Sequence, residues 1–180
     1  MRAVVALDGT SAVDANLETH CLSYAEAKAT IARPIEEVFD FLADGGNTPQ
    51  WMAWVQESTL VGYGGGVGAT YSQRMVSSPL HRKWVAYRIV HCHRPVTLGV
   101  EAHSLPGRPI AMFRLTPADA RTTTVSVQAD LSDAGATAAT GSVGRRWASQ
   151  LVASLPRIKS ALESKSVNGE PTSALQSLRP

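Results

Sequence analysis

Alternating apolar and polar residues open the patterned part of the chain at residues 22–32. The positions on one side of this segment are mostly small, namely Ala25, Ala27, Ala29 and Ile31. A period of two is the period of a strand, whose side chains point in turn to opposite faces. We therefore predict a half-buried strand, whose small inner face either leaves space beneath a helix or packs closely against one.

A helical period follows at residues 33–44. Pro34 stands in the first turn, where its missing N–H costs nothing, and one side of the segment carries Ile35, Val38, Phe39 and Leu42. Glycines then break the pattern, and a second short helix is predicted to begin near Pro49.

Six further strands are predicted between residues 54 and 131, because apolar alternation recurs there between turn-forming residues. Their expected spans are 54–62, 67–77, 84–93, 96–104, 110–117 and 122–131. Consecutive strands joined by short turns form an antiparallel sheet that can face water on one side.

The last patterned segment, residues 141–164, has the period of one long helix. Its apolar stripe consists of Val143, Trp147, Leu151, Leu155, Ile158 and Leu162. Pro156 falls within the stripe and is expected to kink the helix. A helix with one apolar stripe must pack on the sheet. The predicted fold is therefore α+β, a curved antiparallel sheet of about seven strands around a C-terminal helix.

The length of 180 residues suits one domain. We predict an N-terminal tail at residues 1–20, a folded domain at 21–164 and a C-terminal tail at 165–180, both tails being poorly ordered. No apolar run approaches the roughly 18 residues needed to cross a membrane. The short apolar opening is interrupted by Asp8, so a signal peptide is not expected and a cytoplasmic location is predicted.

The net charge is +2, with acidic and basic residues mixed along the chain. The extended basic stripe with aromatic residues that is typical of nucleic-acid binding is missing, so nucleic acid is not an expected partner. Cys21 and Cys92 are isolated thiols without metal-ligand spacing. No metal and no cofactor are predicted, and a homodimer is compatible with the sequence.

Several of these segments together resemble a known family. The resemblance covers residues 22–164 and rests on the order of elements and on Pro34, Val38, Phe39, Leu42, Asp44, Trp51 and Gly68. The chain resembles the START-like (SRPBCC) superfamily, which includes polyketide cyclases and dehydrases, lipid-transfer domains and the birch-pollen-allergen fold. The resemblance implies a helix-grip fold with an internal cavity between sheet and long helix. It does not imply one chemistry.

Residues 87–104 contain three of the five histidines. Alternation places Tyr87, Ile89 and His91 on the inner face and Cys92 and His103 on the outer face. A zinc site needs convergent ligands, which this division does not offer. His91 on a cavity wall could move a proton near neutral pH, or it could satisfy a buried hydrogen bond. A turn at Arg94-Pro95 would place Arg88 opposite Glu101.

The inward positions define where a ligand would lie, although each residue singly is also explained as core. An apolar lining with a few polar groups is what a small-molecule pocket requires. The predicted ligand-contacting residues are Trp54, Tyr71, Gln73, Met75, Tyr87, Ile89, His91, Leu98, Val100, Phe113, Trp147 and Leu151. Trp51 is interpreted as packing under the loop.

Two functions fit these residues. One is a binding module for a small or medium-sized apolar molecule, lipid-like or polyketide-like. The other is a cofactor-independent polyketide cyclase or dehydrase, in which Tyr71, Tyr87 or His91 acts on a folded, reactive chain; holding reacting atoms together can itself accelerate cyclisation. The expected partner is accordingly a small apolar ligand or a polyketide-type substrate.

Overall fold

The computed structural model describes residues 4–6, 24–62, 64–78, 81–105, 108–130 and 138–164. The described strands form a single curved sheet in the order β1-β2-β8-β7-β6-β5-β4-β3. Seven of the strands are antiparallel to their neighbours, and β1 alone runs parallel to β2. The strands are β1 (Val4–Ala6), β2 (Tyr24–Ile31), β3 (Val55–Val61), β4 (Thr70–Ser78), β5 (His81–His93), β6 (Thr97–Glu101), β7 (Ile110–Asp119) and β8 (Thr122–Asp130).

The seven antiparallel strands confirm the predicted sheet and its helix-grip arrangement. The additional strand, β1, lies within the predicted N-terminal tail. Three residues are too few to show a period of two, so alternation could not find this strand. The other residues of both predicted tails lie outside the described part of the chain.

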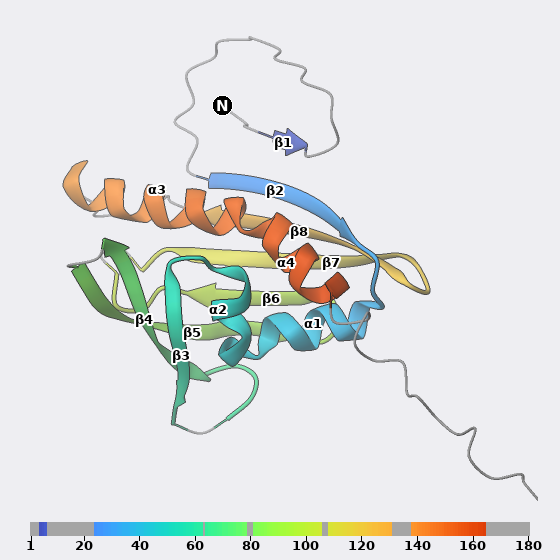
Figure 1. Ribbon diagram of the computed structural model, residues 1–180, viewed down its shortest axis with the longest axis horizontal. Coiled ribbons are helices and arrows are strands. Elements are labelled where there is room, and N and C mark those ends of the chain that lie inside the picture. The colour runs from blue at the N-terminus through green and yellow to red at the C-terminus, as the bar shows by residue number, and fades with distance from the viewer. Residues whose placement is uncertain are drawn as a thin grey trace, which may run out of the picture.

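The helices gather on one face of the sheet, where α3 runs along β2 and β8, α4 continues it over β2, and α1 and α2 lie beside them (Figure 1). They are α1 (Ile35–Ala43), the 3-10 turn η1 (Gly45–Asn47), α2 (Thr48–Trp51), α3 (Ala138–Ala153) and α4 (Leu155–Ser164). Among the described residues, no helix is both long and apolar enough to cross a membrane.

The predicted C-terminal helix is interrupted at Ser154, two residues before Pro156. Proline has no N–H to donate to the carbonyl four residues earlier, so the regular ladder stops there. The Ser154 N–H and hydroxyl both donate to the Leu151 carbonyl, at 3.1 and 2.6 Å. The break turns the helix without exposing its apolar side, because Leu151 and Leu155 are both buried.

The core lies between the sheet and these helices, on the face that alternation predicted. Val125 and Val127 of β8 and Ala27 of β2 are buried, as are Leu155 and Ile158 of α4. Burying a valine, leucine or isoleucine side chain contributes about 1.5–3 kcal/mol. The pocket described below does not involve the alanines of β2, so the inner face of β2 is explained by close packing.

The pairing of β5 with β6 places Arg88 opposite Glu101, as predicted. The loop between the strands has three residues, an odd number that alone would shift the register. A bulge at Val90 adds one unpaired residue to β5 and compensates, so Ile89 still pairs with Val100. At Arg88 and Ile89 the shift from the loop and the shift from the bulge cancel, so the predicted pairs form. At residues 91–93, between the bulge and the loop, the pairing stays shifted by one residue.

Candidate functional site

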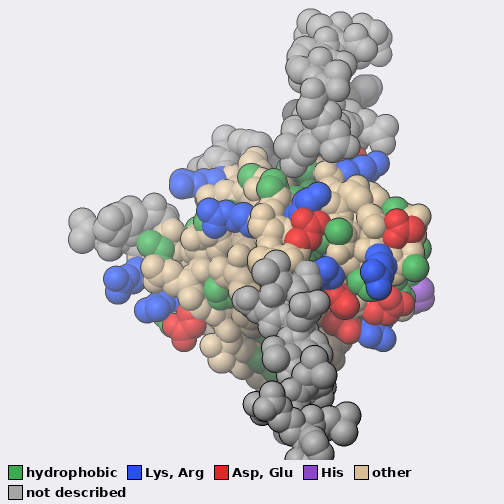
Figure 2. Space-filling model, turned by 45° about the vertical axis from the view of Figure 1, so that its right-hand side comes forward, with side chains coloured by type: hydrophobic (Ala, Val, Ile, Leu, Met, Phe, Trp, Pro, Cys, Tyr) green, Lys and Arg blue, Asp and Glu red, His purple; other side chains and the backbone are tan. Residues whose placement is uncertain are grey.

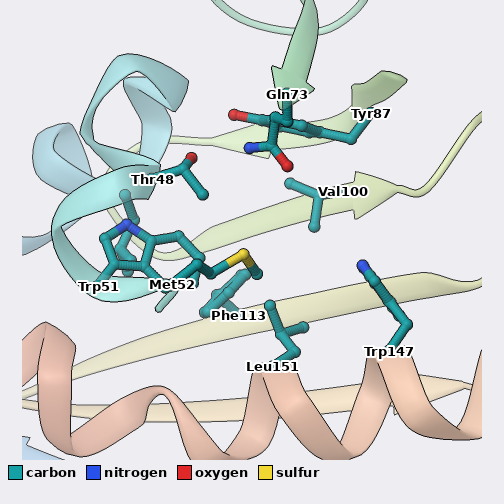
Figure 3. A pocket seen from close by; sticks show the side chains of 10 residues that line it. Thr48, Trp51, Met52, Gln73, Tyr87, Val100, Phe113, Trp147 and Leu151 are labelled. Atoms are coloured by element: carbon teal, nitrogen blue, oxygen red, sulfur yellow. The ribbon is translucent and has the colours of Figure 1, made fainter. Parts of the chain in front are cut away.

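A pocket lies between the sheet, α2 and α3 (Figure 3). The sheet contributes residues from β4, β5, β6 and β7, and the helices close the opposite side. Its lining consists of Leu42, Thr48, Trp51, Met52, Gln73, Tyr87, Val100, Phe113, Trp147 and Leu151. The pocket is thus built by segments far apart in sequence, which only the folded sheet and helices bring together.

The space in this pocket is limited. The hollow between the lining atoms measures about 390 Å³ when the part open to solvent is counted, but the centre of a water molecule has only about 30 Å³ available. That is room for a few water molecules. A larger ligand therefore has to displace side chains, and Met52, the residue that follows α2, is the most adaptable of them, because its unbranched thioether has many rotamers.

Local hydrogen bonds fix the turn that leads from α1 into α2. Asp44 accepts from the Gly46 N–H at 2.9 Å, and the Asn47 amide donates to the Phe41 carbonyl at 3.1 Å. The Thr48 hydroxyl donates to the Gly45 carbonyl at 2.7 Å. These bonds stabilise the turn between α1 and α2, so Thr48 and the two residues that end α2 face the pocket from a fixed backbone.

Tyr87 forms part of the pocket wall and is held from behind by Tyr71. The two rings are stacked, with centroids 5.1 Å apart and planes 10° from parallel. Gly45 approaches both side chains so closely that a Cβ at this position would meet the Tyr87 hydroxyl and lie 2.6 Å from Tyr71 ring carbons. The Tyr87 ring consequently has little freedom to rotate out of the wall.

Burial raises the pKa of Tyr87 well above its ordinary value, although a hydrogen bond with the Thr48 side chain opposes the increase. The phenol therefore keeps its proton at neutral pH. It can donate or accept a hydrogen bond in the pocket, but it is not suited to remove a proton from a substrate.

Half of the predicted contact set does line the pocket: Gln73, Tyr87, Val100, Phe113, Trp147 and Leu151. The other predicted residues lie elsewhere. Tyr71 lies behind Tyr87, Ile89 and Leu98 are buried in the core, and Met75 and Trp54 are partly buried against that core.

The expectation that His91 faces inward is wrong. Its side chain is exposed, and Nε2 lies 2.7 Å from the Thr97 hydroxyl. The cause is the bulge at Val90, which reverses the alternation, so that His91 pairs with Gly99 and Cys92 pairs with the buried Leu98. Cys92, expected on the outer face, accordingly packs against the core.

Four lining residues were not predicted: Leu42, Thr48, Trp51 and Met52. Trp51 was interpreted as packing, and it does pack edge-on against Phe113, with ring centroids 6.3 Å apart, but it also lines the pocket. The short helix α2 has a single turn, which is too short for a period to show which side faces inward. The apolar run at residues 51–55 was the available signal.

The outer face carries a separate charged cluster around Glu101. Although burial favours its neutral form, hydrogen bonds from His103 at 3.1 Å and Arg88 at 3.3 Å outweigh it and lower the pKa of Glu101. The described residues contain no group of three His, Cys, Asp or Glu side chains arranged to hold a metal ion.

Solved structures with the same fold are distant in sequence. An aromatase/cyclase, ZhuI, from Streptomyces sp. R1128 is 15% identical with a TM-score of 0.57, the match covering 84% of this chain and 98% of that one. A START superfamily protein from Mycobacterium smegmatis is 11% identical with a TM-score of 0.57, covering 79% and 95% of the two chains.

Ara h 8.0201 is 18% identical with a TM-score of 0.55, covering 78% of this chain and 97% of its own. Identities this low establish the fold alone. No curated protein sequence matches the chain. Residues 25–163, however, match the model of one family, described as polyketide cyclase / dehydrase and lipid transport, and the chain therefore belongs to that family.

Proposed function

We propose that the protein binds a small or medium-sized apolar molecule, polyketide-like or lipid-like, in the pocket between the sheet, α2 and α3. The observation that carries this proposal is the lining itself. Most of the lining side chains are apolar, and Gln73, Thr48 and Tyr87 add a few polar groups on one side. An apolar wall with few polar groups is typical of small-molecule pockets.

On the face drawn in Figure 2, the described surface offers no apolar docking patch. Hydrophobic side chains on that view are dispersed among acidic and basic ones and form no broad patch. Contiguous apolar surface is the usual mark of a protein interface. The cytoplasmic location and the homodimer stay predictions from the sequence.

Native mass spectrometry of the freshly purified protein, followed by solvent extraction, tests the proposal. We expect one apolar molecule per chain, or uptake of one when an apolar compound is added. A Val100→Phe variant should lose this molecule, because the larger side chain fills the pocket. Stoichiometric uptake that is unchanged in that variant, or no uptake by the folded wild type, would show that the pocket is not the binding site.

The alternative is a polyketide cyclase-type enzyme that uses the same pocket. It is favoured by the Tyr87 hydroxyl, which lies in the wall, stays protonated and can donate a hydrogen bond to a carbonyl of a folded chain. Tyr71 could act only through Tyr87, by holding its ring. With a polyketide-type substrate, Tyr87→Phe should lower turnover sharply in an enzyme, whereas a carrier should show no turnover and a modest loss of affinity.

A further inference from the structure

Among the residues whose side chains the structure describes, none that lines the pocket is charged near neutral pH. The ten described residues that line it include no Asp, Glu, Lys, Arg or His, and their one titratable group, Tyr87, keeps its proton. A carboxylate or ammonium group entering such a site would give up its hydration without gaining a partner of opposite charge, which is costly. The lining therefore favours an uncharged ligand.

Two polar groups in the wall point into the same space. Gln73 is only 5% exposed, and its Nε2 donates to the Ser58 hydroxyl at 3.4 Å, which leaves Oε1 toward the pocket. Figure 3 shows the Gln73 amide and the Trp147 indole nitrogen both directed toward the space beside Val100. In the described part of the chain, neither Gln73 Oε1 nor Trp147 Nε1 has a hydrogen-bond partner.

We infer that the pocket selects uncharged ligands that carry a hydroxyl group, and that Gln73 and Trp147 recognise this hydroxyl. The inference rests on the proposed function and adds the ligand's chemical class. A hydroxyl donates one hydrogen bond and accepts others. It can thus donate to Gln73 Oε1 and accept from the Trp147 N–H at once, whereas an ether or ketone can only accept and a carboxylate also brings an unpaired charge.

Three ligands with the same ring system separate these effects in calorimetric titrations at pH 7. They are 2-naphthol, 2-methylnaphthalene and 2-naphthoate, of which only the carboxylate is ionised at this pH, because phenols titrate near about 10 and carboxylic acids near about 4. We expect 2-naphthol to bind tightest. Each hydrogen bond should add about 2- to 10-fold over 2-methylnaphthalene, and 2-naphthoate should bind at least about tenfold more weakly than 2-naphthol.

Two substitutions connect the selectivity to the named side chains. Gln73→Leu and Trp147→Phe should each reduce the ratio of 2-naphthol affinity to 2-methylnaphthalene affinity, because each variant removes one hydrogen-bond partner of the hydroxyl. Leu155→Met is the matched control, since Leu155 continues the same buried helix stripe but does not line the pocket. This variant should keep the wild-type preference.

Failure of this inference differs from failure of the pocket. If wild type binds 2-naphthoate as tightly as 2-naphthol, or does not distinguish 2-naphthol from 2-methylnaphthalene, hydroxyl selectivity is refuted while the pocket stands. If neither neutral ligand binds, or Val100→Phe binds both unchanged, the pocket is refuted and this inference with it. A preference that survives both Gln73→Leu and Trp147→Phe would overturn their role.

Discussion

Gly45 lies directly against the hydroxyl group of Tyr87, with no room between them for a side chain. This contact joins the turn between α1 and α2 to β5, two segments about 40 residues apart in the sequence. Tyr71 stacks on the Tyr87 ring, and its own ring carbons also lie against Gly45. The wall of the pocket thus depends on a position where only hydrogen fits.

Gly45→Ala should destabilise the protein. The added Cβ would clash with the Tyr87 hydroxyl and with ring carbons of Tyr71, and neither ring can yield without breaking the stack. Overpacking of this kind costs about 1–3 kcal/mol. The free energy of unfolding in urea measures the effect.

Gly64→Ala is the matched control for that substitution. A Cβ at Gly64 would meet its nearest neighbour, Leu60, at an ordinary 3.5 Å, so stability should change little. If Gly45→Ala is as stable as wild type, the side chains of Tyr87 and Tyr71 are packed less tightly against Gly45 than the structure indicates.

The raised pKa of Tyr87 predicts a loss of stability in alkali. Because the folded-state pKa lies above the unfolded value, the stabilisation is complete below about pH 10 and is lost as the pH rises beyond it. Urea unfolding at pH 8 and pH 11 measures this loss. Tyr87→Phe removes the titrating group, so the stability difference between wild type and variant should shrink at the higher pH; a constant difference would refute the assignment.

The stabilisation that Glu101 contributes should depend on pH in the opposite direction to that of Tyr87, and Glu101→Gln removes it. The pKa of Glu101 is lowered in the folded state, so its stabilisation is present above the unfolded value of about 4.3 and is lost as the pH falls below it. At pH 7 the substitution should cost about 1.5–3 kcal/mol, the range for hydrogen bonds to a charged group.

Glu57→Gln provides the comparison for Glu101. Glu57 pairs with Arg74 at 3.4 Å, but its side chain is 49% exposed, and exposed ion pairs contribute little. Chemical denaturation from pH 3 to pH 7 should therefore show a pH-dependent difference from wild type for Glu101→Gln alone. If stability depends on pH in the same way in both variants, the ion pairs of Glu101 contribute no more to stability than an exposed surface pair does.

His91→Ala should leave ligand binding unchanged, whereas Tyr87→Phe should weaken it. The His91 side chain is exposed on the outer face, while Tyr87 lines the pocket. Titration of both variants with 2-naphthol measures the difference. If His91→Ala binds 2-naphthol more weakly and Tyr87→Phe binds it as wild type does, the His91 side chain faces the pocket, as alternation alone predicts.

Alternation and helical period were sufficient to predict the seven antiparallel strands, the helices and the inner face of β8, since burial imposes those periods directly. They failed where one extra residue in a strand reverses which side chains face inward. The bulge at Val90 is not visible in the sequence, and it turned His91 outward and Cys92 inward.

The candidate site was predicted only in part for a related reason. Alternation identifies inward residues, but it does not distinguish a residue that lines a pocket from one that packs below it. Ile89 and Leu98 share the inner face with Tyr87 and Val100, yet they are buried in the core. The helix contribution from Thr48 and Met52 depends on where α2 docks, which is a tertiary contact.

The most direct test of the pocket is to follow the four tryptophan indole N–H signals by NMR during titration with 2-naphthol. Trp51 and Trp147 line the pocket, whereas Trp84 is 55% exposed on β5. We predict that the Trp51 and Trp147 signals shift in a saturable manner at one ligand per chain while the Trp84 signal does not. An unmoved Trp147 signal, or shifts confined to Trp84, would contradict the proposed binding site.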